Sequence, residues 1–229
     1  MATHYAAFRP PLHEPILAQL LAASKPRRIG IDIGCGTGCS AHALAVHCEQ
    51  TIGIDPSFAM LLEARGQTGT SFVNASGEAV PVARQCADTV TLAGSLNYLD
   101  RDRLVPELLR ICRPGAEIAV YDFCIDLADI EALLTIADEE EADYDHCIDL
   151  AGYAGLELCA QGEAESRLAL TPTELAHLLL AGAGRHRQLA EAFDVANPFE
   201  ALVARLAQEG KRFELSAQSF HALYTAAGT

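Results

Sequence analysis

The stretch RIGIDIGCGTG, residues 28–38, decides the fold of this chain. Its first part, Arg28 to Ile33, predicts a buried strand, because apolar runs of this length are typical of strands covered on both faces. Three glycines follow at alternate positions, Gly34, Gly36 and Gly38, ahead of a predicted helix. A tight turn alone does not require three alternate glycines, whereas glycines let backbone N–H groups approach a ligand closely. The loop between strand and helix therefore predicts a binding site.

Outward from this loop, short β-type runs alternate with helical stretches up to about residue 123. Such alternation predicts parallel strands joined by helices. Ser57 is expected to cap the second helix, and Pro106 to lie in the first turn of the third. The predicted strands are 28–33, 51–55, 71–74, 89–93 and 117–123, and the predicted helices are 40–48, 57–65 and about 104–112.

Beyond residue 123 the pattern changes to an acidic helical region over 127 to about 153, which includes the run Asp138–Glu141. A sixth strand or strand pair is expected at 156–170, helices from 171 to about 210, and a last strand at 213–225. We therefore expect one α/β domain with a Rossmann-like, doubly wound, mostly parallel seven-stranded sheet. Helices should cover both faces, with a helical insertion before the last strand.

Composition limits the partners and the compartment. The chain has 31 Asp and Glu against 16 Lys and Arg, a formal net charge of −15, which repels nucleic acid and anionic lipid surfaces. No apolar run reaches the roughly 18 residues of a membrane span, and charged and proline residues interrupt the first fifteen positions. Eight cysteines without a CxxC pair suit a reducing compartment. We expect a cytoplasmic protein with no membrane span, disulfide or metal site.

A dinucleotide-binding GxGxxG loop is the competing interpretation of the glycine stretch. Here the third glycine comes one residue early, Cys39 occupies its place, and Asp32 precedes the first glycine. Asp55 lies 21 residues beyond Gly34 at the predicted end of the second strand. A carboxylate there can accept hydrogen bonds from both hydroxyls of a ribose, a feature that both interpretations share.

Five motifs separate the two interpretations, because together they resemble, in order and spacing, the motif series of class I S-adenosylmethionine-dependent methyltransferases. The resemblance covers roughly residues 5–123 and is closest to the small-molecule branch related to ubiquinone-biosynthesis and aconitate-type methyltransferases. It implies S-adenosylmethionine as the cofactor and a small-molecule acceptor. The motifs are Asp32-x-Gly-x-Gly-x-Gly38, Gly53-Ile-Asp55, Ala75-Ser-Gly-Glu-Ala-Val-Pro81, Asp88-Thr-Val90 and Leu109-Arg-Ile-Cys-Arg-Pro-Gly115.

The resemblance also implies a role for each part of the donor site. The glycine loop would hold the methionine portion of the donor, Asp32 its amino group, and Asp55 its ribose. Where relatives usually have an acidic residue that contacts the adenine amine, this chain has Ser76, with Glu78 two positions on. The implied cofactor-binding residues are Tyr5, Arg9, Asp32, Gly34, Cys35, Gly36, Gly38, Asp55, Pro56, Ser76, Gly77, Glu78 and Ser95.

Two further segments resemble parts of the same branch. Tyr5-x-x-x-Arg9-Pro10 is similar to its N-terminal lid, and Ser95 to Tyr98 matches the segment that lines the boundary between donor and acceptor. The single domain over residues 1–229 would then comprise an N-terminal lid and helix at 1–27, a donor-binding core at 28–123, and acceptor-side helices and last strands at 124–229.

Methyl transfer from a sulfonium needs mainly a positioned nucleophile in a pocket poor in water, so no catalytic residue is assigned. An acceptor that is a weak acid would gain from a base, and Tyr98, Asp122 or His146 could be recruited. Two other functions stay open. One is a non-catalytic domain that binds S-adenosylmethionine, and the other, which the motif series disfavours, is a pyridine-nucleotide oxidoreductase.

Overall fold

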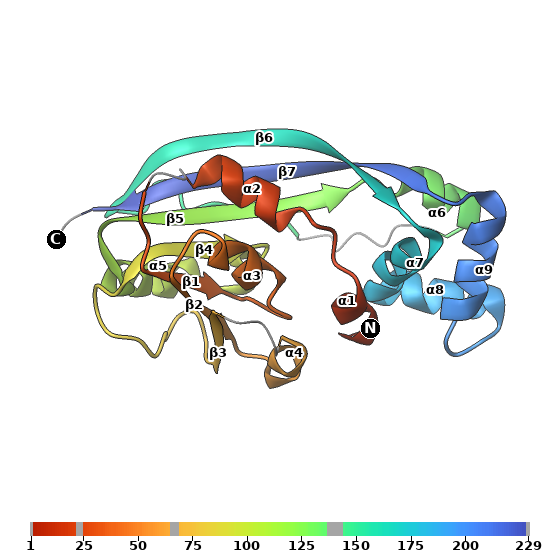
Figure 1. Cartoon of the computed structure of the whole chain (residues 1–229), viewed down its shortest axis with the longest axis horizontal. Coiled ribbons are helices and arrows are strands. Elements are labelled where there is room, and N and C mark those ends of the chain that lie inside the picture. Colours follow the sequence, from red (N-terminus) through yellow and green to blue (C-terminus); the bar gives the residue numbers. More distant parts are fainter. Residues whose placement is uncertain (1, 22–24, 65–68, 137–143, 228–229) are drawn as a thin grey trace. The chain divides into compact units, whose positions relative to one another are not determined.

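One seven-stranded sheet, in the order β3-β2-β1-β4-β5-β7-β6, organises the part of the chain that the structure describes (Figure 1). The computed structural model describes residues 2–21, 25–64, 69–136 and 144–227, without the side chains of Ala2, Tyr5 and Ala6. The predicted number of strands is confirmed. The strands are β1 Ile29–Ile33, β2 Gln50–Asp55, β3 Thr70–Asn74, β4 Ala87–Ala93, β5 Cys112–Ile125, β6 Leu156–Leu170 and β7 Phe213–Ala226.

Most of the sheet is parallel, as predicted. Strand β1 pairs in parallel with both β2 and β4, β2 pairs with β3, and β4 pairs with β5. At the far edge, Ser166 Oγ donates to the Ala217 carbonyl and Ser219 Oγ to the Ala164 carbonyl, so β6 and β7 run in opposite directions. The chain builds β2 and β3 on one side of β1 and then crosses to β4 on the other. The strand order therefore reverses between β1 and β4, and in open α/β sheets ligands bind at the carboxyl ends of the strands at such a point.

Helices cover both faces of the parallel part of the sheet. On β1, Ile31 is fully buried in a cluster that includes Leu104 and Leu108 of α5. The neighbouring Gly30 faces the opposite side, where a Cβ would lie 3.0 Å from Leu44 Cδ2 of α3. The helices are α1 Ala2–Ala7, α2 His13–Leu20, α3 Cys39–Ala45, α4 Phe58–Glu63, α5 Arg101–Ile111, α6 Ala128–Leu134, α7 Pro172–Ala181, α8 Ala183–Phe193 and α9 Phe199–Glu209, with a 3-10 turn, η1, at Leu96–Tyr98.

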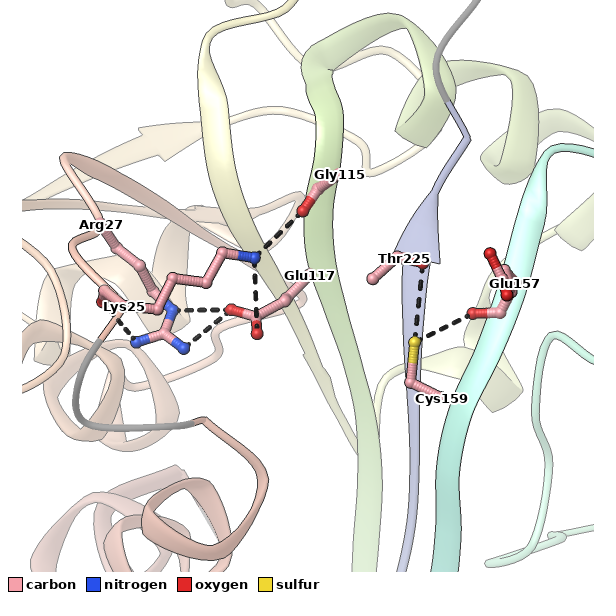
Figure 2. Close-up of polar contacts among 7 residues, drawn as sticks. All are labelled: Lys25, Arg27, Gly115, Glu117, Glu157, Cys159 and Thr225. Atoms are coloured by element: carbon pink, nitrogen blue, oxygen red, sulfur yellow. Dashed lines mark hydrogen bonds and ion pairs between the residues drawn. The ribbon is translucent and has the colours of Figure 1, made fainter.

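A buried ion pair joins the segment just before β1 to β5, across the intervening β4 (Figure 2). Arg27 Nη2 lies 2.7 Å from Glu117 Oε2, and the two side chains are 1% and 10% exposed. Arg27 Nε donates to the same oxygen over 2.9 Å. Lys25 Nζ lies 3.6 Å from Glu117 Oε1 and donates to the Gly115 carbonyl. Each charge in the pair compensates the burial of the other, so the loss of either one is costly.

The chain groups into two compact units. The first comprises Met1–Pro10, Cys124–Tyr144 and Glu165–Gln218, and the second Pro11–Phe123, Asp145–Ala164 and Ser219–Thr229. In the first unit α7 packs against α1, α8 and α9. The second unit contains β1 to β4 with the helices between them. The expectation that residues 1–229 form a single domain stays a prediction.

Two helix predictions were wrong in part. Helix α5 begins at Arg101, because Asp100 accepts a hydrogen bond from the Asp102 N–H and caps it there. Pro106 therefore lies in the second turn and not in the first. Ser57 does cap α4, through a hydrogen bond from the Met60 N–H, as expected.

The predicted helix over 127–153 is only seven residues long, since α6 ends at Leu134, just before Thr135 adopts a φ of +56°. Residues 144–153 form turns, because Asp145 and Asp149 accept hydrogen bonds from backbone N–H groups two positions on. Such side-chain bonds compete with helix formation. The acidic run 138–141 lies outside the described residues.

No helix in the described part of the chain combines the length and the apolar composition that a membrane crossing requires.

Candidate functional site

The predicted glycine loop joins β1 to α3, and its three glycines adopt left-handed backbone angles, with φ of +73°, +53° and +86° at Gly34, Gly36 and Gly38. A Cβ at Gly34 would lie 2.3 Å from Ser95 Cβ, and one at Gly38 would lie 2.8 Å from the Phe72 ring. At Gly36, a Cβ would meet no protein atom within 4 Å. The loop is thus packed at both ends and open at its middle, as a cradle for a ligand requires.

Asp55, at the carboxyl end of β2, holds the open middle of this loop. Its Oδ2 accepts a hydrogen bond from the Gly36 N–H over 2.8 Å, and its Oδ1 accepts one from the Ser57 N–H over 2.7 Å. The residue is buried, with 8% of its surface exposed. A carboxylate has about four lone-pair positions, so two bonds leave acceptor capacity for ligand hydroxyls. The structure therefore brings Asp55 and the loop together, as the sequence predicted.

Asn74, at the end of β3, is a supporting residue that sequence reasoning missed. It pairs with Asp55 across the parallel β2–β3 ladder. Its Nδ2 donates to the carbonyls of Asp55 and Pro56, each over 2.9 Å, and so fixes the turn that follows β2. The sequence feature that could have identified Asn74 is its position directly before the Ala75–Pro81 motif.

Asp32 is fully buried beneath the loop. Ser40 Oγ donates to its Oδ2 over 2.5 Å and Thr91 Oγ1 to its Oδ1 over 2.6 Å, which ties β1 to α3 and β4. Burial raises the pKa of Asp32 to about 6, although both hydroxyl donors act in the opposite direction. In this arrangement both of its oxygens bind protein hydroxyls. Direct contact of Asp32 with the donor's amino group stays a prediction.

The segment Ser76–Glu78, predicted to contact adenine, forms a turn packed on the end of β1. A Cβ at Gly77 would lie 2.4 Å from Ile33 Cγ2. Ser76 Oγ donates to Glu78 Oε2, and Glu78 Oε1 accepts from the Asp100 N–H, each over 2.9 Å. The Asp100 N–H, followed by the Ser76 hydroxyl, lowers the pKa of Glu78. Glu78 is thus held as a carboxylate beside the turn.

Ser95 packs against the glycine loop, and Cys35 lies within it. Ser95 Oγ donates to the Ile33 carbonyl over 2.7 Å and so fixes the segment after β4 against the end of β1. Cys35 is buried, and its N–H donates to the Ile54 carbonyl of β2. Burial raises the pKa of the Cys35 thiol, so it stays protonated and unreactive.

Of the three residues that could serve as a base, the structure brings two together. His146 Nδ1 lies 2.8 Å from Asp122 Oδ2, whereas Tyr98 is 72% exposed. His146 lines a cavity of about 340 Å³ within the second unit. The lining residues are Val120, Tyr121, His146, Cys147, Ile148, Asp149, Gln161, Gly162, Glu163, Phe220, His221 and Ala222.

The predicted lid residues belong to the first unit. Arg9 follows α1, and the side chain of Tyr5 lies outside the described residues. Their contact with a donor stays a prediction.

Known proteins match the central part of this chain. A family profile described as a methyltransferase domain matches residues 31–120. The probable S-adenosylmethionine-dependent methyltransferase CRG1 of Saccharomyces cerevisiae is 30% identical over 129 residues, which cover 52% of this chain and 44% of that protein. The ubiquinone/menaquinone biosynthesis C-methyltransferase UbiE of Acidiphilium cryptum is 31% identical over 116 residues, 47% of this chain and 45% of that protein. The matches thus span less than half of each relative.

A solved structure extends the likeness of the fold to nearly the whole chain. A protein assigned as a type II methyltransferase from Anaeromyxobacter dehalogenans superposes with a TM-score of 0.70 at 18% identity, covering 97% of this chain and 100% of that one. At this identity the likeness shows the fold alone. Together with the family profile and the relatives, it confirms the resemblance to class I methyltransferases and the Rossmann-like fold.

Proposed function

We propose that this chain, whose residues 31–120 match a methyltransferase domain profile, transfers a methyl group from S-adenosylmethionine to a small molecule. The observation that carries the proposal is the pairing of the open Gly36 position with Asp55 at the point where the strand order reverses. This pairing offers backbone N–H groups and a carboxylate to one ligand.

The residues present fit the donor. The loop Gly34–Gly38 would hold its methionine portion, Asp55 its ribose and Ser76–Glu78 its adenine. The fit rests on the empty space at Gly36, which a side chain on any other residue would enter. When bound, the donor supplies an electrophilic methyl group, and the chain's own task is to orient the acceptor and exclude water.

A pyridine nucleotide fits the same loop less well. In a dinucleotide loop a glycine at the position of Cys39 allows close helix–strand packing. Here the close packing occurs at Gly38, where a Cβ would lie 2.8 Å from the Phe72 ring and 3.2 Å from Ala64 Cβ. The compact loop thus favours an adenosyl ligand over one that carries a pyrophosphate.

The proposal of a small-molecule acceptor has two supports. The net charge of −15 opposes nucleic acid, and one matched relative is named as a ubiquinone/menaquinone biosynthesis C-methyltransferase. We likewise propose that the protein works in the cytoplasm without a nucleic-acid or membrane partner.

The test is the transfer of tritium from methyl-labelled S-adenosylmethionine to a small-molecule cell extract, with purified RNA and DNA as parallel acceptors. We expect label in the small-molecule fraction alone, and its loss in Asp55→Ala. Label in nucleic acid that persists at moderate salt would refute the proposed acceptor class. Binding of S-adenosylhomocysteine with no transfer to any fraction would instead identify a non-catalytic binding domain.

A further inference from the structure

His146 is linked to the proposed donor site by a short series of contacts. Ser95 packs against Gly34 of the glycine loop. Two residues on, in η1, Asn97 Nδ2 donates to the Asp145 carbonyl over 2.9 Å, and Asn97 Oδ1 accepts from the Asp145 N–H over 3.1 Å. One amide side chain thus fixes both backbone groups of Asp145, the residue before His146. The segment after β4 therefore positions His146 relative to the donor loop.

The register of the sheet places Asp122, the partner of His146, at the same edge of the sheet as the glycine loop. Asp32 of β1 pairs with Thr91 of β4, which pairs with Ala119 of β5. Asp122 lies three residues beyond Ala119, as Cys35 lies three beyond Asp32. Strand β4 separates β1 from β5, so the backbones of Asp32 and Ala119 are about two strand spacings, roughly 10 Å, apart. A ligand bound at the glycine loop and one beside Asp122 would be neighbours.

The contact between Asp122 and His146 has the geometry of a general base whose ring is oriented by a carboxylate. Because an ionised carboxylate can only accept, the 2.8 Å contact places a proton on Nδ1 and directs Nε2 away from Asp122. The His146 ring is also stacked on Phe220, with centroids 6.1 Å apart and an interplanar angle of 20°. The carboxylate and the phenyl ring thus fix the tautomer and the orientation of the imidazole.

The residues that line the cavity beside His146 indicate which class of acceptor the cavity can bind. Asp149 and Glu163 contribute carboxylates, and none of the twelve described lining residues is Lys or Arg. A carboxylate or phosphate acceptor would meet no lysine or arginine among these residues and would be repelled by the two carboxylates. Val120, Ile148 and Phe220 add apolar surface. The cavity suits a small uncharged or cationic molecule with an apolar body.

We propose that His146 is the general base for an acceptor of this class whose nucleophilic hydroxyl or amine carries a proton, and that Asp122 is its positioning residue. The proposal rests on the proposed methyl transfer and specifies its acceptor. The proton of the nucleophile passes to Nε2 of His146, and the nucleophile's electron pair forms the bond to the methyl carbon. The electrons of the broken carbon–sulfur bond stay on sulfur, and His146 then releases its proton to water.

The first test uses labelled methyl transfer to three matched panels of small aromatic compounds that bear a hydroxyl, an amine or a carboxylate. We expect transfer to the first two panels only. His146→Gln should lower kcat at least about 100-fold, the scale of general-base catalysis, and keep the affinity for S-adenosylhomocysteine within twofold. His47→Gln, in the turn after α3, is the matched control and should leave kcat unchanged.

A second readout does not depend on turnover. Nitrogen-15 NMR of the imidazoles should show the Nδ1–H tautomer for His146, and Asp122→Asn should shift it toward Nε2–H while lowering kcat less than His146→Gln does.

Preference for carboxylates, an Nε2–H tautomer in the wild type, or a His146→Gln kcat within threefold of wild type would overturn this proposal. So would a wild-type protein that binds S-adenosylhomocysteine but methylates neither hydroxyl nor amine probes. These results leave donor binding intact. Failure of the proposed function is distinguished from them by the extract assay, because the wild type would then bind no adenosyl ligand or would transfer label to no fraction of the extract.

Discussion

Removal of the Asp55 carboxylate should weaken both the fold around the glycine loop and the binding of the donor. In Asp55→Ala the N–H groups of Gly36 and Ser57 lose their acceptor, and the parent bonds are 2.8 and 2.7 Å long. Hydrogen bonds to a charged group contribute about 1.5–3 kcal/mol each, and water can reach this half-exposed loop. We therefore expect the free energy of unfolding to fall by about 2–4 kcal/mol.

Donor affinity should fall at least tenfold in the same variant, since loss of one charge-assisted bond to a ribose hydroxyl exceeds about 1.4 kcal/mol. Asp55→Asn is the control, because its single carbonyl oxygen can accept only part of the bonds, and both effects should be intermediate. Urea denaturation followed by circular dichroism, and calorimetric titration with S-adenosylhomocysteine, measure the two quantities. An Asp55→Ala protein that unfolds at the wild-type midpoint and binds within twofold of wild type would refute the reasoning.

Three other substitutions probe separate parts of the structure. Gly36→Val should abolish binding of S-adenosylhomocysteine and leave the circular dichroism spectrum intact, because its side chain enters open space and not the core; near-normal affinity in calorimetry would argue against the loop as the donor site. Asp32 has a folded pKa of about 6, above its ordinary value of 3.8, so its burial opposes folding increasingly as the pH rises from about 4 to 6. In the wild type the raised pKa should lower the free energy of unfolding by at most about 3 kcal/mol over that pH range, and Asp32→Asn should remove this loss. Urea midpoints measured across the range test this, and a pH dependence in Asp32→Asn equal to that of the wild type would contradict it. Glu117→Gln leaves the buried Arg27 charge uncompensated and should lower the free energy of unfolding by about 3 kcal/mol in urea titration, whereas a loss under about 0.5 kcal/mol would show that the pair is dispensable.

The sequence predicted the parallel part of the fold and the proximity of Asp55 to the glycine loop, because both depend on local patterns. The apolar run before Gly34 and the spacing to Asp55 predict two strand ends at the same edge of a sheet. The structure places Asp55 against Gly36, in agreement with that spacing.

Features that depend on individual side-chain contacts could not be predicted in this way. The start of α5 depends on a cap at Asp100, and the turns at 144–153 depend on aspartates that bond their own backbone. Acidic composition alone does not distinguish such turns from a helix. The contact of Asp122 with His146 joins residues 24 positions apart through a segment without regular periodicity.

The most direct test of the central claim is a calorimetric titration of the wild-type protein with S-adenosylhomocysteine, alongside NAD and NADP. The account predicts saturable binding of the adenosyl ligand and no binding of either pyridine nucleotide. Tighter binding of NAD or NADP than of S-adenosylhomocysteine would contradict it.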